Sequence, residues 1–127
     1  MSQIEDIAEH LDDIAAGALY ENEHGEYVRV MNPEAISEDD ELTEVSIYDY
    51  LDDNFGCWFL LDWDLEVIGG RIMVAFGGPN IYIDASAEEV QQYWGFSVEK
   101  TPLTTDAVLL VIDYLKEVYE SRRCASR

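Results

Sequence analysis

Residues 57–84 read CWFLLDWDLEVIGGRIMVAFGGPNIYID, and the spacing of the apolar residues in this stretch decides the fold. Apolar side chains recur at every second position, which is the period of a β-strand with one buried face. Paired glycines and the sequence GGPN interrupt the pattern at places where the chain can turn tightly. The predicted strands are Trp58–Val67, Arg71–Phe76, Ile81–Asp84 and about Val90–Phe96, with turns at Gly69-Gly70 and Gly77-Gly78-Pro79-Asn80.

Helical spacing flanks these strands on both sides. Apolar residues at positions 4, 7, 11 and 14 predict a first helix over about 3–16. Ser46 can cap a short second helix that runs through about Asp53 with Tyr48 turned inward, and Thr104 can cap a third helix near the C-terminus. The predicted buried stripe of this third helix is Val108, Leu109, Ile112, Leu115 and Tyr119.

The segment between the first two helices has a less regular pattern. Alternation over 27–31 predicts a short strand that Pro33 stops, whereas residues 34–45 are acid-rich and are predicted to form a solvated loop. The order of elements therefore predicts an α+β fold: an antiparallel β-meander of about four strands with an additional short N-terminal strand, flanked by N- and C-terminal helices. The length of 127 residues fits one domain, residues 1–127.

The charge of the chain is its most unusual property. The net charge is −21, and residues 1–66 hold 20 Asp and Glu against Arg29 alone, which leaves −19 in this half. Such a chain lacks the basic face that direct nucleic-acid binding requires, and anionic membranes would repel it. No apolar run approaches the ~20 residues of a membrane span and no signal-peptide pattern is present, so we expect a cytoplasmic protein. With 48% hydrophobic residues, the chain is too apolar to be disordered.

No arrangement typical of an enzyme active site is present. Asp62, Asp64 and Glu66 alternate along the first predicted strand, but carboxylates on an exposed face lack the burial or charge coupling that raises a catalytic pKa. His10 lies on the polar side of the first predicted helix and is expected at the surface, and the two cysteines lack the spacing of a metal site or a catalytic pair. We therefore expect no catalytic residue, no metal site and no cofactor.

One long motif carries a family resemblance. The motif is RIMVAFGGPNIYID at 71–84, followed by Gln92-Tyr93-Trp94. It resembles a motif of small acidic, uncharacterised proteins encoded on bacterial mobile elements, and the similarity extends over about residues 44–120. The resemblance implies a setting among the accessory genes of phages, plasmids and conjugative elements, where inhibitors of restriction and CRISPR systems are common.

The charge and the resemblance together predict a non-enzymatic inhibitor that acts as an acidic nucleic-acid mimic. Duplex DNA presents one negative charge per ~1.7 Å of its axis, and an ordered carboxylate surface can occupy the same basic channel. The expected partner is a basic nucleic-acid-binding protein or nuclease complex of host defence, of the restriction or CRISPR type. The predicted partner-binding residues are Glu38, Asp39, Asp40, Glu41, Glu44, Asp49, Asp52, Asp53, Asp62, Asp64 and Glu66.

An alternative function is a protein-binding regulatory or assembly adaptor, whose acidity serves solubility only. Aromatic side chains dominate the energetics of protein interfaces. The rings that could form such an interface on the sheet belong to Trp58, Tyr82, Tyr93 and Trp94. The sequence leaves open whether the chain is a monomer or a homodimer.

Overall fold

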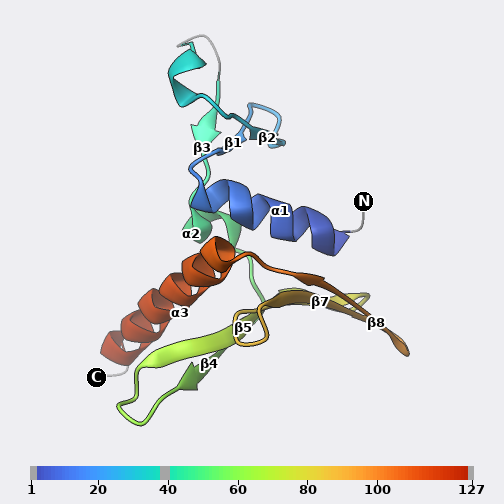
Figure 1. Ribbon diagram of the computed structural model, residues 1–127, viewed down its shortest axis with the longest axis vertical. Coiled ribbons are helices and arrows are strands. Elements are labelled where there is room, and N and C mark those ends of the chain that lie inside the picture. The colour runs from blue at the N-terminus through green and yellow to red at the C-terminus, as the bar shows by residue number, and fades with distance from the viewer. Residues whose placement is uncertain (1–2, 38–40, 126–127) are drawn as a thin grey trace.

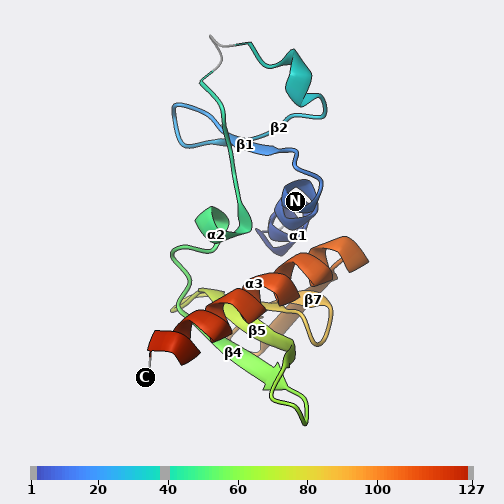
Figure 2. The ribbon, with the colours of Figure 1, turned by 90° about the vertical axis from the view of Figure 1, so that its left-hand side faces the viewer.

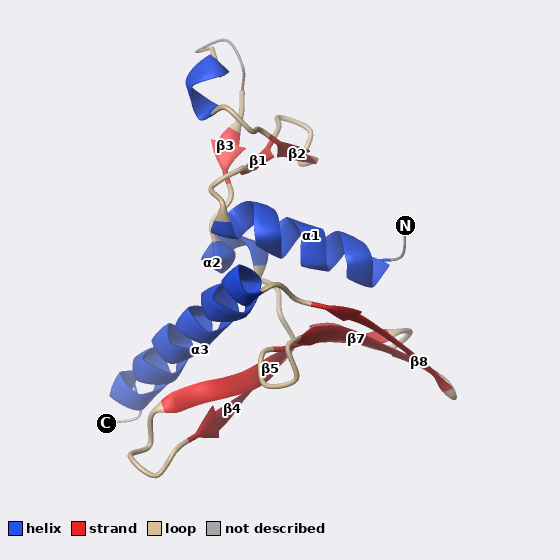
Figure 3. Cartoon of the chain, viewed as in Figure 1, coloured by secondary structure: helices blue, strands red, loops and turns tan. Residues whose placement is uncertain are grey.

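Two helices cover one face of a five-stranded antiparallel sheet, and a smaller sheet stands at one end of the molecule (Figures 1 and 3). The computed structural model describes residues 3–37 and 41–125. The helices are α1 (Gln3–Ala15), the 3₁₀ turn Pro33–Ala35, α2 (Ile47–Tyr50) and α3 (Thr105–Ala125). The strands are β1 (Leu19–Glu21), β2 (Tyr27–Arg29), β3 (Thr43–Glu44), β4 (Gly56–Leu61), β5 (Val67–Ala75), β6 (Asn80–Asp84), β7 (Glu89–Trp94) and β8 (Ser97–Pro102).

The large sheet is a meander in which every strand pairs with the next one along the chain, in the order β4-β5-β6-β7-β8. This architecture confirms the predicted α+β class with flanking helices, although the meander has five strands because β8 follows β7 after a short turn. Ile72, Ile83 and Val90 are register partners and are fully buried beneath the helices. Helix α3 contacts β4 and β5, while α1 contacts β7 and β8.

The predicted strand Trp58–Val67 is wrong, because the chain turns in its middle. Strand β4 ends at Leu61, β5 begins at Val67, and the two pair as a hairpin. The Asp62 carboxylate creates this turn, since its Oδ1 accepts hydrogen bonds from the backbone N–H of Asp64 at 2.9 Å and of Glu66 at 3.0 Å. Asp62, Asp64 and Glu66 therefore lie in a turn and do not alternate along a strand face.

The predicted turn at Gly69-Gly70 is also wrong, since both glycines lie inside β5. Gly70 pairs with Phe59 and has a φ of +141°, and a Cβ on it would lie 2.1 Å from the Trp58 carbonyl oxygen. Only glycine permits this close approach of β4 to β5. Register shifts at Leu60/Leu61 and at Met73/Ala75 flank β5 on its two sides.

The predicted turn at residues 77–80 is present and connects β5 to β6. The Asn80 side chain closes it, because its Oδ1 accepts a hydrogen bond from the Gly77 backbone N–H at 2.9 Å. Asn and Gly are favoured here for their ability to form local hydrogen bonds and to adopt positive φ, and Gly77 has a φ of +97°. The turn chemistry was therefore readable from the sequence.

The small sheet has the order β2-β1-β3, with β1 pairing to both neighbours. Only β2 coincides with a predicted strand. The expectation of a loop throughout 34–45 is wrong at the 3₁₀ turn and at β3, where Glu44 pairs with Tyr20. Strands of two or three residues are too short to show a period, so the sequence pattern could not reveal them.

The short helix α2 and the long helix α3 begin at their predicted caps. Ser46 and Asp49 form a capping box on α2, which ends at Tyr50 instead of near Asp53, and Tyr48 is 51% exposed instead of turned inward. Thr104 caps α3 by accepting a hydrogen bond from the Ala107 N–H at 3.2 Å. The predicted stripe of α3 is wrong at Leu109, which is 54% exposed. The residues of α3 that are buried are Ala107, Val108, Val111, Tyr114 and Leu115.

Candidate functional site

The structure distributes the predicted acidic residues over separate parts of the molecule. Glu38, Asp39 and Asp40 lie outside the described residues. The others lie in three places: Glu41 and Glu44 at and before β3; Asp49, Asp52 and Asp53 in α2 and the turn after it; Asp62, Asp64 and Glu66 in the β4–β5 turn. Figures 1 and 2 show β3 and the β4–β5 turn at opposite ends of the long axis. The described members of the set therefore do not share one continuous surface.

Two of these acids have a role in holding the backbone. The Asp49 carboxylate accepts hydrogen bonds from the Ser46 N–H at 3.3 Å and from the Ser46 hydroxyl at 3.0 Å, which completes the capping box. The Asp62 carboxylate holds the β4–β5 turn as described above. Each is therefore fixed in position, and substituting either one would disturb its local fold.

Carboxylates do gather in what we name the acidic lobe, formed by α1, β1–β3, α2 and the turn after α2. Its centre is a cluster of three rings, His10, Tyr27 and Tyr50, with centroids 5.0 to 5.6 Å apart. The Tyr50 hydroxyl and His10 Nδ1 are 2.9 Å apart and share a hydrogen bond. His10 is therefore half-buried between two tyrosines, and the expectation of a simple surface histidine is wrong.

The tyrosines of this cluster respond to carboxylates from separate elements. Burial raises the pKa of Tyr27, and the negative charges of Glu21, Asp49 and Asp53 raise it further. Burial also raises the pKa of Tyr50 strongly, with smaller contributions from Tyr27 and Asp6. Negative charge thus acts on one small region from four places: α1, β1, α2 and the turn after α2.

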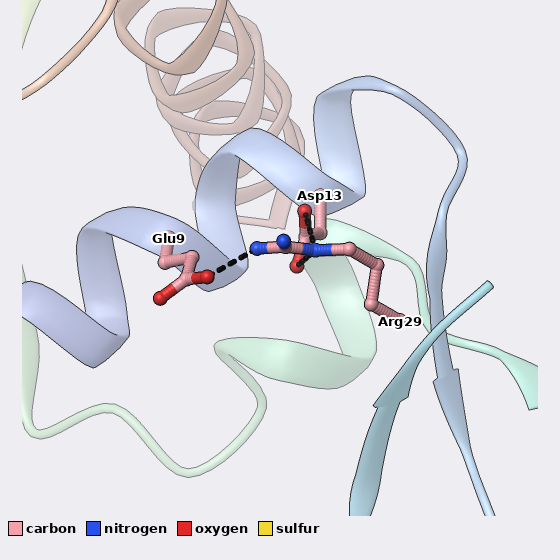
Figure 4. A network of polar contacts seen from close by, with 3 residues as sticks. All are labelled: Glu9, Asp13 and Arg29. Atoms are coloured by element: carbon pink, nitrogen blue, oxygen red, sulfur yellow. Dashed lines mark hydrogen bonds and ion pairs between the residues drawn. The ribbon is translucent and has the colours of Figure 1, made fainter. Parts of the chain in front are cut away.

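Arg29 lies against α1 at the edge of the same region (Figure 4). Its Nε donates to both carboxylate oxygens of Asp13, at 2.9 and 3.0 Å, and its Nη2 donates to Glu9. These hydrogen bonds, with Asp13 the larger contributor, raise the pKa of Arg29. Since Arg29 is the only Lys or Arg in residues 1–66, no other cation of these two types remains in this half for its other carboxylates.

The prediction from sequence missed the acids of α1 and β1. Asp6, Glu9 and Asp13 recur at intervals of three and four residues, which places them on one side of α1 together with His10. This spacing was visible in the sequence. That Asp6 acts on the same ring cluster as Glu21 and Asp53 was not visible, because it depends on how the small sheet and α2 pack beside α1.

The second notable surface is the side of the large sheet that faces away from α1 and α3, which we name the open face. Figure 1 shows both helices on the same side of this sheet, and no helix of the described residues covers the other. The strand registers place two rows of side chains on the open face. One row is Trp58, Arg71, Asp84 and Glu89, and the next is Met73, Tyr82, Gln91 and Lys100.

Arg71 lies between two aromatic rings at the centre of the open face. Its guanidinium carbon is 5.0 Å from the Trp58 ring centroid and 4.5 Å from that of Tyr82, which is the geometry of a cation–π contact. Tyr82 in turn packs edge-on to Tyr93, with centroids 5.8 Å apart. Trp58 remains 45% exposed and Tyr93 36% exposed, so the described part of the chain leaves these rings accessible.

A polar network crosses the other half of the open face. Gln91 is buried, donates from Nε2 to Glu89 at 2.8 Å and to Asp84 at 3.4 Å, and accepts from the Tyr93 hydroxyl at 3.3 Å. Lys100 forms an ion pair with Glu89, with the nitrogen and oxygen 3.5 Å apart. The two rows of the open face therefore hold two cations and two carboxylates, in contrast to the acidic lobe.

The two parts of the family-like motif meet at one end of the large sheet. A Cβ on Gly78 would lie 2.9 Å from the Trp94 ring, so the indole packs directly on the glycine turn. A shallow pocket at this point is lined by Phe76, Gly77, Gly78, Asn80, Tyr93, Trp94 and Gly95. The motif thus builds a hairpin end, and the contact explains why glycine and tryptophan occur together in it.

The described residues do not offer a metal site. Histidine, cysteine and acidic side chains there form no group of three or more placed to hold a metal ion. Burial raises the pKa of the half-buried Cys57 thiol, with Arg122 opposing the shift, and Cys57 Sγ is 3.7 Å from Asn54 Oδ1. No described helix is both long enough and apolar enough to cross a membrane. No family model, no curated protein and no solved structure matches the chain.

Proposed function

We propose that the chain is a non-enzymatic binding protein whose acidic lobe occupies the nucleic-acid-binding surface of a basic partner. The partner class is a nuclease complex of host defence, of the restriction or CRISPR type. The observation that carries the proposal is the engagement of Arg29 by Glu9 and Asp13. That engagement leaves the remaining carboxylates of residues 1–66 without a lysine or arginine of their own half.

The order of the lobe supports the proposal as much as its charge does. A polyanion mimic must hold its charges in a defined arrangement, because mobile side chains lose conformational entropy when they bind. Arg29 fixes Glu9 and Asp13 on α1, and the capping box fixes Asp49 on α2. Opposite charge on the partner would then steer association, and dissolved salt would weaken it.

The test uses two variants that change the net charge equally at different places. In E21K/D53K the reversed residues belong to the acidic lobe, and in D64K/E66K they belong to the β4–β5 turn. All four residues are exposed, and none of their side chains holds a cap or a turn. The assay measures displacement of a labelled DNA duplex from purified restriction nucleases and CRISPR effector complexes, over a series of salt concentrations.

We expect the unaltered chain to displace the duplex from at least one complex, with an effect that declines as salt rises. E21K/D53K should weaken displacement by about tenfold, which corresponds to ~1.4 kcal/mol, and D64K/E66K should weaken it far less. Equal losses in the two variants would mean that only net charge matters. Absence of displacement from every complex would refute the mimicry.

A further inference from the structure

The open face exposes a group of large apolar side chains. By register Trp58, Leu60, Tyr93 and Val98 all point away from the helices, and their exposed fractions are 45%, 48%, 36% and 51%. Contiguous exposed apolar patches that are rimmed by polar groups mark interaction sites. Polar groups lie beside these apolar side chains, in the network around Gln91 and in Lys100.

The charges of the open face identify the kind of partner that fits it. Arg71 and Lys100 are balanced by Asp84 and Glu89, so the two charged rows have no net charge although the chain as a whole carries −21. A nucleic acid would need an excess of cations, and a strongly basic protein would find more carboxylates on the acidic lobe. A surface with equal numbers of positive and negative charges best fits another surface on which the charges also cancel.

A second copy of this chain supplies a surface of that kind. The structure stacks Arg71 on two rings and pairs it with no carboxylate of the described residues. In a two-fold arrangement each copy would present Arg71 to Asp84 or Glu89 of the other, while the rings around it pack together. We propose that the open face is the interface of a symmetric homodimer.

The size of the face sets the strength of the association. Five strands spaced about 4.8 Å apart, with about six residues each at ~3.3 Å, define a face of roughly 20 by 20 Å. Its projection of ~400 Å² per copy is about half of a standard interface, which is near 800 Å² per partner. A contact of this size places the dimer among weak, reversible associations.

The position of the acidic lobe gives the dimer a distinctive response to salt. Figure 1 places β1–β3 on the helix side of the large sheet, so the lobes of two copies joined at their open faces would lie far from the contact. The two chains nevertheless repel each other through their net charge, and salt screens that repulsion. Salt should strengthen dimerisation, whereas it should weaken the displacement of nucleic acid proposed above.

Sedimentation analysis of the purified chain over a range of concentrations and salt tests the interface. W58A removes the ring that stacks on Arg71 from β4, and V98R places a charge on an exposed position of β8 that has no role in the core. W63A is the matched control, since Trp63 is 100% exposed but lies in the β4–β5 turn, away from the open face. Circular dichroism checks that each variant is folded.

We expect a dimer that tightens as salt rises, about a tenfold or larger increase in its dissociation constant for W58A and for V98R, and little change for W63A. A chain that stays monomeric at high concentration and high salt would overturn the proposal and would assign the face to a different protein. A dimer that persists in both W58A and V98R would overturn it as well, because the contact would lie elsewhere. Neither outcome bears on displacement of nucleic acid, which is measured with a partner complex.

Discussion

Replacing Gly70 by alanine should destabilise the fold more than the same substitution at any other glycine of this sheet. The φ of +141° lies in a region that costs an L-residue about 1–3 kcal/mol. The added Cβ would also lie 2.1 Å from the Trp58 carbonyl oxygen, a backbone atom that cannot rotate away. Overpacking of this kind adds about 1–3 kcal/mol, so the expected loss is about 4 kcal/mol of the free energy of unfolding.

Urea unfolding followed by tryptophan fluorescence measures this loss. With a slope of roughly 1–3 kcal/mol per molar urea, G70A should lower the midpoint by about 2 M. The control is G95A: Gly95 also has a positive φ, +58°, but a Cβ there would meet no atom within 4 Å, so its cost should be about 1 kcal/mol. Equal losses in G70A and G95A would refute the steric argument and the pairing of β4 with β5 at this position.

Three further predictions concern single side chains. R29Q should lower the thermal midpoint, and added salt should narrow the difference from the unaltered chain, because Arg29 offsets the repulsion between Glu9 and Asp13. Burial raises the pKa of Tyr50 far above its ordinary value of 10.0, so the folded state holds this proton more tightly than the unfolded state does. Its contribution to stability is therefore complete below pH 10.0 and is lost as the pH rises toward the folded-state pKa. Y50F removes the hydrogen bond to His10 and should lower the free energy of unfolding by about 1 kcal/mol at neutral pH. As the pH rises above 10.0, its free energy of unfolding should fall less than that of the unaltered chain. The raised pKa of Cys57 predicts slow alkylation of this thiol at neutral pH in the native chain and a marked acceleration in urea, as followed by mass spectrometry.

The sequence predicted those parts of the fold whose signals are local. The cap at Thr104, the capping box at Ser46 and the glycine turn before Asn80 each depend on residues within a few positions of one another. The hairpin at 62–66 was missed because its apolar residues, Trp63 and Leu65, continue the period of two through the turn. Both are exposed, and Leu65 has a positive φ of 63°. Their spacing is that of a strand with one buried face, but here neither side chain is buried.

Gly70 shows a different limit of the sequence pattern. Paired glycines commonly mark a turn, and here they mark a place where two backbones approach closely inside a sheet. The alternatives can be distinguished only when the partner strand is known. The same holds for β1 and β3, whose short segments gain their structure from pairing across a long sequence separation.

The acidic character of the candidate site follows from composition, whereas the grouping of carboxylates in the acidic lobe depends on the tertiary fold. The excess of acid in the first half was evident from composition, yet the prediction favoured the longest runs of acids, and part of that set falls on residues 38–40, outside the described chain. Asp6 lies in a helix with an evident role in the core, and Glu21 lies in β1, a strand too short to show a period. Their common location near Tyr27 and Tyr50 follows from tertiary packing.

The register shifts on both sides of β5 bear on how this chain behaves at high concentration. A large sheet with unprotected edges at β4 and β8 offers unpaired backbone groups to any passing chain, and a flat sheet of that kind propagates into fibres. Irregular pairing increases the local twist, so each added copy would be rotated relative to the last and the mismatch would accumulate. Substitutions that restore regular pairing along β5 should therefore favour ordered aggregates.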